Sequence, residues 1–147
     1  MKKIEVSLFF SMLLWLSTGI SEDAIYTALF SNAAVGGYDP VTYFTQDSPA
    51  KGNQAYALEH EGATWYFISK ENRRLFQSNP EKYAPQYGGY CAWAIAHDTT
   101  ARGDPKQWTL YQGKLYLNYD AAIKKDWEQD KPRWIREADR NWPKVLQ

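Results

Sequence analysis

Two short runs of aromatic and apolar residues, each divided by a residue pair that ends in glycine, constrain the fold most strongly. The dividing pairs are Glu61-Gly62 and Gln112-Gly113. A glycine-containing pair between two strand-forming runs is typical of a tight hairpin turn, because glycine adopts the positive φ that such turns require. The sequence therefore predicts two β-hairpins, with strands at residues 55–60 and 63–69 and at residues 108–111 and 114–119.

Each predicted hairpin is followed by a polar residue that suits the start of a helix. Ser69 precedes a run through Phe76, and Asp120 precedes residues 121–130. Serine and aspartate are favoured at this position because the side-chain oxygen accepts an N–H of the first helical turn. The turn glycines, these two caps, and Phe76 with Trp127 are all 51 residues apart. The spacing predicts two similar hairpin-and-helix layers and leaves a duplication open.

The length and composition predict a single small domain. A chain of 147 residues can bury one modest core, and the 16% of aromatic residues supplies much apolar area without disulfides. We expect an α+β domain of short antiparallel β-hairpins packed with several short helices. Residues 22–36 are interpreted as an N-terminal arm. Residues 37–147 are interpreted as the domain, with a C-terminal helical extension that begins near Pro132.

The first residues differ in character from the rest. Lys2 and Lys3 precede an apolar run from Val6 to Leu16 and then small residues up to Ser21, the layout of a secretory signal peptide. We expect residues 1–21 to be cleaved and the protein to be periplasmic or secreted, with no membrane span after cleavage; an uncleaved anchor is the alternative.

The charge of the chain bears on its partners. The 17 basic and 17 acidic residues give no electrostatic reason to expect binding of nucleic acid, which needs a basic face. A periplasmic protein partner remains open.

The stretch from Asn79 to His97 concentrates the unusual chemistry. It holds the single cysteine, Cys91, directly after Gly88-Gly89-Tyr90. Residues 90–97 are predicted to form a short buried helix with Cys91 in its first turn. Backbone N–H groups there stabilise a thiolate, which indicates a reactive thiol. The alternative is that Cys91 is a small buried apolar residue.

Few residues are available to partner this thiol. His97 lies six positions after Cys91 and would point to another face of the helix. His60, at the end of the first predicted strand, is the only other imidazole. Cys91 with His60 is therefore the candidate soft-metal site, although an exposed histidine without a role is the simpler interpretation of His60. Tyr87 and Tyr90 are candidates for lining a small pocket, with ordinary aromatic core as the alternative.

Several motifs resemble the YHS domain, a small module related to the TRASH metal-binding group. They are Asp39-Pro40-Val41, Thr64 to Ser69, and Phe76 to Tyr83. Asp39 itself is interpreted as the cap of a short helix, with a ligand contact as the alternative. The continuation through Gly88-Gly89-Tyr90-Cys91 resembles an exported bacterial subgroup, some members of which carry selenocysteine at the Cys91 position. That resemblance implies nucleophilic or redox chemistry at Cys91.

The chain departs from metal-handling YHS domains. Those domains have cysteines at the positions of Thr42 and Ile68 and near Asn72, and none of these side chains offers a thiolate or imidazole. The first hypothesis is an exported protein that binds a soft metal such as copper, or does single-thiol redox chemistry, through Cys91. The second is a non-catalytic binding or interaction module with Cys91 buried in its core. Whether the protein is an enzyme is left open.

Overall fold

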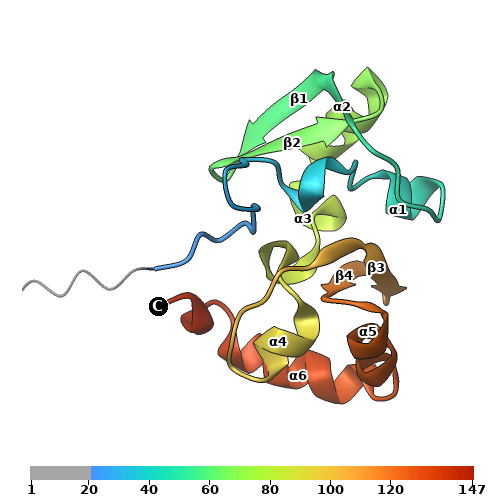
Figure 1. Ribbon diagram of the computed structural model, residues 1–147. Coiled ribbons are helices and arrows are strands. Elements are labelled where there is room, and N and C mark those ends of the chain that lie inside the picture. The colour runs from blue at the N-terminus through green and yellow to red at the C-terminus, as the bar shows by residue number, and fades with distance from the viewer. Residues whose placement is uncertain (1–20) are drawn as a thin grey trace, which may run out of the picture.

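The computed structural model describes residues 21–147, which form two halves that each contain one β-hairpin (Figure 1). The predicted signal peptide lies outside the described residues apart from Ser21. Helices and hairpins are mixed along the chain, so the predicted α+β class is confirmed.

The two halves contain corresponding elements in the same order. The first half runs through the 3-10 helix η1 (Val35–Gly37), α1 (Thr42–Thr45), β1 (Asn53–His60), β2 (Ala63–Phe67), α2 (Lys70–Ser78) and α3 (Pro80–Tyr83). The second runs through η2 (Gln86–Gly89), α4 (Ala92–Ala96), β3 (Asp104–Tyr111), β4 (Lys114–Asn118), α5 (Ala121–Glu128), α6 (Lys131–Asn141) and η3 (Lys144–Leu146). The predicted layers of hairpin and helix are therefore present in both halves.

Both hairpins are antiparallel, and the strands of the two hairpins pair in equivalent registers. His60 pairs with Ala63, and Tyr111 pairs with Lys114. Each first strand also carries an irregularity, before Ala57 in β1 and before Trp108 in β3. The strand predicted at residues 108–111 is too short, since β3 begins at Asp104. The irregularity explains the error, because extra residues on one strand break the alternation that marks a strand in sequence.

The predicted helix caps are confirmed. Ser69 Oγ accepts the backbone N–H of Asn72 at 3.1 Å, and Asp120 Oδ1 accepts that of Ile123 at 2.8 Å. Asn79 and Asp130, again 51 residues apart, cap α3 and α6 in the same way. In each half a side-chain oxygen therefore caps the start of both helices that follow the hairpin.

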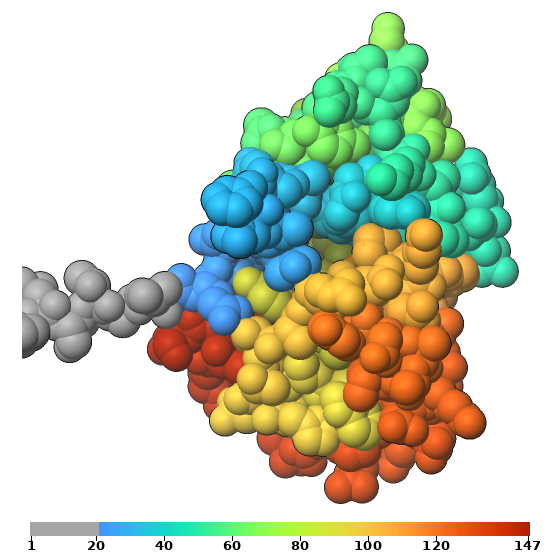
Figure 2. Space-filling view, viewed as in Figure 1, coloured from blue at the N-terminus to red at the C-terminus, as the bar shows by residue number. Residues whose placement is uncertain are grey.

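Each half has its own apolar core. Trp65 and Phe76 pack at a ring distance of 4.7 Å in the first, and their counterparts Tyr116 and Trp127 pack at 5.1 Å in the second. Strand β4 joins the two cores, since Leu115 and Leu117 belong to the first and Tyr116 to the second. Figure 2 shows the two halves as adjoining masses, with early residues above and late residues below.

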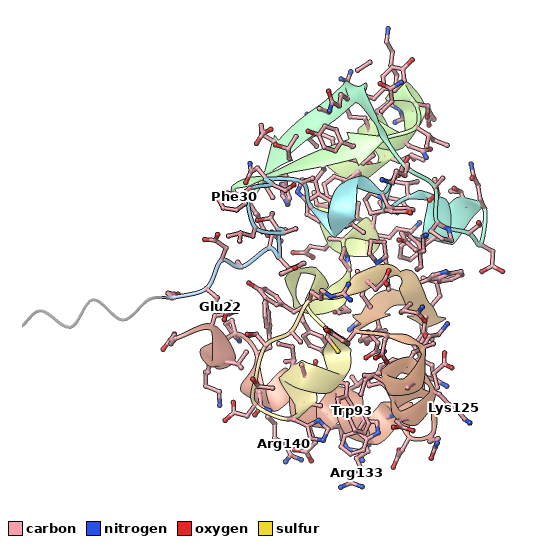
Figure 3. All side chains as sticks on the ribbon, viewed as in Figure 1. Glu22, Phe30, Trp93, Lys125, Arg133 and Arg140 are labelled. Atoms are coloured by element: carbon pink, nitrogen blue, oxygen red, sulfur yellow. The ribbon has the colours of Figure 1, made fainter. Side chains whose placement is uncertain are left out.

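The arm of residues 22–36 runs along both halves. The N–H of Tyr26 donates to Gly88 O at 2.9 Å, and that of Ala34 donates to Thr64 O at 2.9 Å. Phe30 lies fully exposed at the outer tip of the arm (Figure 3). None of the helices within residues 21–147 has the length and apolar character needed to cross a membrane.

Candidate functional site

Asp39 is a buried acidic residue at the junction of three elements. Its Oδ1 accepts the N–H of Val41 at 2.8 Å. Its Oδ2 accepts the N–H of Ile68 at 2.8 Å and Asn72 Nδ2 at 2.7 Å. Helix α1 begins at Thr42 with Val41 before it, so the simple helix cap expected of Asp39 is wrong. Its carboxylate instead ties the start of α1 to the link between β2 and α2.

The positions at which the resemblance places the cysteines of metal-handling YHS domains, namely Thr42, Ile68 and one near Asn72, lie around Asp39. Ile68 and Asn72 donate to Asp39 Oδ2, and Thr42 Oγ1 donates to the Asp39 backbone oxygen at 2.8 Å. Hydrogen bonds thus occupy the place where thiolates would gather. Within residues 21–147 no three or more His, Cys, Asp or Glu side chains are arranged to hold a metal ion.

Cys91 is 1% exposed and lies directly before α4. The sequence placed it within the first helical turn; the structure places it at the N-cap, because Cys91 has an extended backbone and its N–H donates to Ala101 O at 2.9 Å. Its Sγ lies 3.6 Å from Asn118 Oδ1 at the end of β4. The thiol is therefore held between α4 and the second hairpin.

The surroundings of Cys91 favour the thiol over the thiolate. Burial raises the pKa of Cys91, and this effect is larger than the opposing one of the backbone N–H groups of Ala94, Tyr119 and Trp93. The sequence-based expectation of a thiolate favoured by the helix start is contradicted. Helix α4 has only 5 residues, so its dipole is small, while the desolvation of a charged sulfur is large.

His60 and Cys91 lie in different halves of the protein. The His60 ring packs on Phe76 at 5.6 Å, and its Nε2 is 3.9 Å from Glu61 Oε1. Cys91 contacts Asn118 and pairs with Leu117 in the second hairpin. The structure therefore does not bring together the two residues of the candidate soft-metal site.

His97 is exposed and points away from Cys91, as expected. Its ring lies 4.5 Å from that of Trp93 and 5.1 Å from that of Trp134. Arg133 covers the Trp134 ring at 4.5 Å. Figure 3 shows Trp93 and Arg133 near each other at the end of the second half. These contacts join α4 to α6.

Tyr87 and Tyr90 line two different cavities, neither of which includes Cys91. Tyr87 lines one of about 370 Å³ with Lys114, and Tyr90 lines one of about 360 Å³ near the arm. Both hydroxyls donate hydrogen bonds, to Asp139 Oδ1 and to Asp23 O, each at 2.8 Å. Burial raises the pKa of Tyr90 to about 12 and also raises that of Tyr87, where the Asp139 hydrogen bond adds to the effect. Both phenols are therefore neutral structural donors.

A third cavity, of about 350 Å³, lies beside the turn of the first hairpin. It is lined by residues from the turn and from the junction of α2 and α3, namely His60, Glu61, Ser78, Asn79, Pro80, Glu81 and Ala84. Two carboxylates and an imidazole line it together with apolar carbons, and its lining includes no lysine or arginine. The cavity is therefore suited to a ligand that carries a positive charge or several hydrogen-bond donors.

Sequence reasoning selected His60 but missed the rest of this cavity. Ser78, Asn79 and Glu81 entered the sequence argument only as part of the motif from Phe76 to Tyr83. A second missed signal is the tripeptide Gly-Gly-Tyr, which occurs at residues 36–38 and again at residues 88–90. The residue after each copy is Asp39 or Cys91, so the repeat marks the two buried side chains as counterparts.

Comparison with protein families supports the resemblance over the first half. The family model for the YHS domain matches residues 41–87. The match covers the first hairpin, α2, α3 and every residue that lines the cavity beside His60. Searches of curated proteins and of solved structures find no match.

Proposed function

We propose that this protein is a non-catalytic binding module that takes a small cationic ligand, such as an amine, in the cavity beside His60. The observation that carries the proposal is the lining of that cavity, in which Glu61 and Glu81 face a space of about 350 Å³ beside an imidazole. The volume lies at the lower end of the range for small-molecule sites. Its position within residues 41–87 supports a role for the segment that matches the YHS domain.

The geometry favours this function over one based on Cys91. Joint binding of a soft metal by Cys91 and His60 would need both ligands within about 2.0–2.3 Å of one ion. The His60 ring instead packs on Phe76 in the first half, and Cys91 Sγ lies beside Asn118 in the second. A redox thiol needs access and thiolate character, whereas Cys91 is 1% exposed and burial raises its pKa. Cys91 is better explained as part of the core.

We also propose that the protein acts outside the cytoplasm. The support is the pattern of residues 1–21, with two lysines, an apolar run and small residues before the described part of the chain. N-terminal sequencing of the protein after expression in a bacterial host with its native N-terminus tests this. A new terminus near Glu22 is the expected result, and retention of Met1 on protein in the cytoplasm would contradict it.

Binding of benzylamine, followed by NMR chemical shifts, tests the proposed ligand class. Benzyl alcohol, of the same shape but uncharged, is the matched probe. We expect benzylamine to shift the amide signals of residues 60–61 and 78–81, and benzyl alcohol to bind more weakly. E61Q with E81Q should weaken benzylamine binding by about fivefold to thirtyfold, because each substitution removes one charge attraction of about 0.5–1 kcal/mol.

E137Q is the control for this pair. Glu137 lies on α6 in the other half and pairs with Arg140. The substitution E137Q therefore removes a carboxylate that does not line the cavity. Equal weakening by E137Q, or equal binding of both probes, would contradict a cationic site at this cavity.

A further inference from the structure

The cavity beside His60 has an equivalent place in the second half of the protein. Residues 51 positions apart are equivalent in the two halves, as the hairpin pairings and the helix caps show. His60 and Tyr111 are each the last residue of the first strand of their hairpin. Pro80 and Lys131 are each the first residue of the second helix after that hairpin. His60 and Pro80, which both line the cavity, therefore correspond to Tyr111 and Lys131.

In the second half an ammonium group of the protein itself occupies this place. Lys131 Nζ lies over the Tyr111 ring, 5.4 Å from the ring centroid, and donates to Glu128 O at 3.4 Å. A lysine ammonium over an aromatic ring is attracted by the negative charge of the ring face. The second half therefore fills the place beside its hairpin turn with its own lysine side chain.

The first half offers the opposite charge at the equivalent place. The position of Lys131 is taken by Pro80, whose ring carries no charge, so the cavity lining holds no ammonium. It holds instead the carboxylates of Glu61 and Glu81, whose counterparts in the second half are neutral residues. Among the described residues, neither carboxylate forms an ion pair with a lysine or an arginine. A cation for this cavity therefore has to come from another molecule.

We propose that the cavity beside His60 binds a linear alkylammonium group, the group that a lysine side chain carries, in the place that Lys131 fills in the second half. This inference rests on the cation-binding function proposed above and names the class of cation. The His60 ring takes the part of the Tyr111 ring. The two carboxylates supply additional attraction, which a ligand from outside needs because it loses translational freedom on binding, whereas Lys131 is part of the chain.

The other groups that line the cavity match an alkylammonium group in kind. Ser78 Oγ donates to Leu75 O at 2.7 Å, so this oxygen can still accept a hydrogen bond from a ligand. Ionised carboxylates are acceptors only, and an ammonium group is a donor only. The carbons of Pro80 and Ala84 offer an apolar surface for the methylene chain. The lining thus combines acceptors for the charged end of the ligand with apolar contact for its stem.

Titration of the wild-type protein with Nα-acetyl-lysine methylamide, followed by NMR chemical shifts, tests the ligand class. Nα-acetyl-norleucine methylamide is the matched probe, because it has the same unbranched chain without the ammonium group. We expect the blocked lysine to shift the amide signals of residues 60–61 and 78–81. It should bind at least about fivefold more tightly than the blocked norleucine. Titration with n-butylamine distinguishes the source of the group, since a free amine should bind more tightly than the blocked lysine only if no peptide is needed.

These titrations separate the ligand class from the proposed function. Binding of benzylamine at these residues without binding of either alkylamine would overturn the alkylammonium inference and leave the cation-binding function in place. Absence of these shifts with every amine would overturn both. Equal binding of the blocked lysine and the blocked norleucine would also overturn the inference, because the ammonium group would then contribute nothing.

A P80K variant tests the equivalence with Lys131 directly. It places a lysine at the first position of α3, as Lys131 stands in α6, so the new ammonium should fill the cavity from within. P80Q is the matched control, because its side chain at the same position carries no charge. We expect P80K to weaken binding of the blocked lysine at least about tenfold, since a tethered group competes at high effective concentration, and P80Q to weaken it at most about threefold. Equal weakening by the two variants, or binding to P80K as tight as to wild type, would overturn the inference.

Discussion

At the scale of the residue, the Asp39 carboxylate accepts three hydrogen bonds, two of them buried and one half-buried. Val41 N, Ile68 N and Asn72 Nδ2 all lie within 2.8 Å of its carboxylate. These donors come from the start of α1, the end of the first hairpin and α2. One side chain therefore fixes the relative positions of three elements.

D39A should destabilise the protein by about 3 kcal/mol, because it leaves two buried donors and one half-buried donor unpaired at about 1–3 kcal/mol for each buried one. Urea unfolding followed by tryptophan fluorescence measures the change. D126A is the control, since Asp126 is an exposed carboxylate on α5. A loss of free energy in D39A no larger than that in D126A would show that the carboxylate does not hold these elements together.

The sequence predicted which residues are unusual but not what surrounds them. Asp39 and Cys91 both stand out by type and position, yet Asp39 was interpreted as a local cap, and Cys91 as a helix-start thiolate with a small buried apolar residue as the alternative. Their surroundings come from β2 and β4, some 27 residues or more along the chain. Propensity and spacing report local contacts, so the burial that raises the pKa of Cys91 could not be inferred from them.

At the scale of the element, the hairpins and helix caps could be predicted because local chemistry determines them. A turn glycine with positive φ, 77° in Gly62 and 74° in Gly113, marks each hairpin. The start of β3 could not be predicted, because Asp104 and Pro105 are typical of loops and the irregular pairing before Trp108 hides the strand. The separation of His60 from Cys91 also depends on how the two halves pack.

Substitution by alanine should cost less stability at a glycine whose Cβ position is open than at one whose Cβ position is crowded. In Gly113 a Cβ meets nothing within 4 Å, so G113A should cost about 1–2 kcal/mol from the positive φ alone. In Gly103 a Cβ would lie 2.2 Å from Gly89 O, which is backbone and cannot move aside alone. G103A should therefore cost more than G113A in urea unfolding.

The first half supplies the same comparison. Gly52 corresponds to Gly103, with a Cβ position 2.4 Å from the Tyr66 backbone, and Gly62 corresponds to Gly113. G52A should therefore lower the free energy of unfolding more than G62A does in the same assay. If either crowded variant matched its open counterpart in stability, the close approach of strand and link in that half would be wrong.

At the scale of the whole molecule, the two halves have the same order of elements but carry different candidate functional residues. The first half matches the YHS domain and carries the acidic cavity beside His60. The second carries Cys91 within the core, and β4 joins the two through Leu117 and Tyr116. The preference for a binding function at this cavity over chemistry at the thiol therefore rests on Cys91 being shielded in the folded protein rather than available as a ligand or nucleophile.

Labelling of Cys91 by an aromatic disulfide reagent, measured from pH 6 to pH 9 with and without urea, tests this most directly. We expect the folded protein to react at least about a thousandfold more slowly than the unfolded protein, because reaction requires opening of the structure. The rate should rise with urea as the protein unfolds. Labelling of the folded protein near neutral pH within about tenfold of the unfolded rate would contradict the buried thiol.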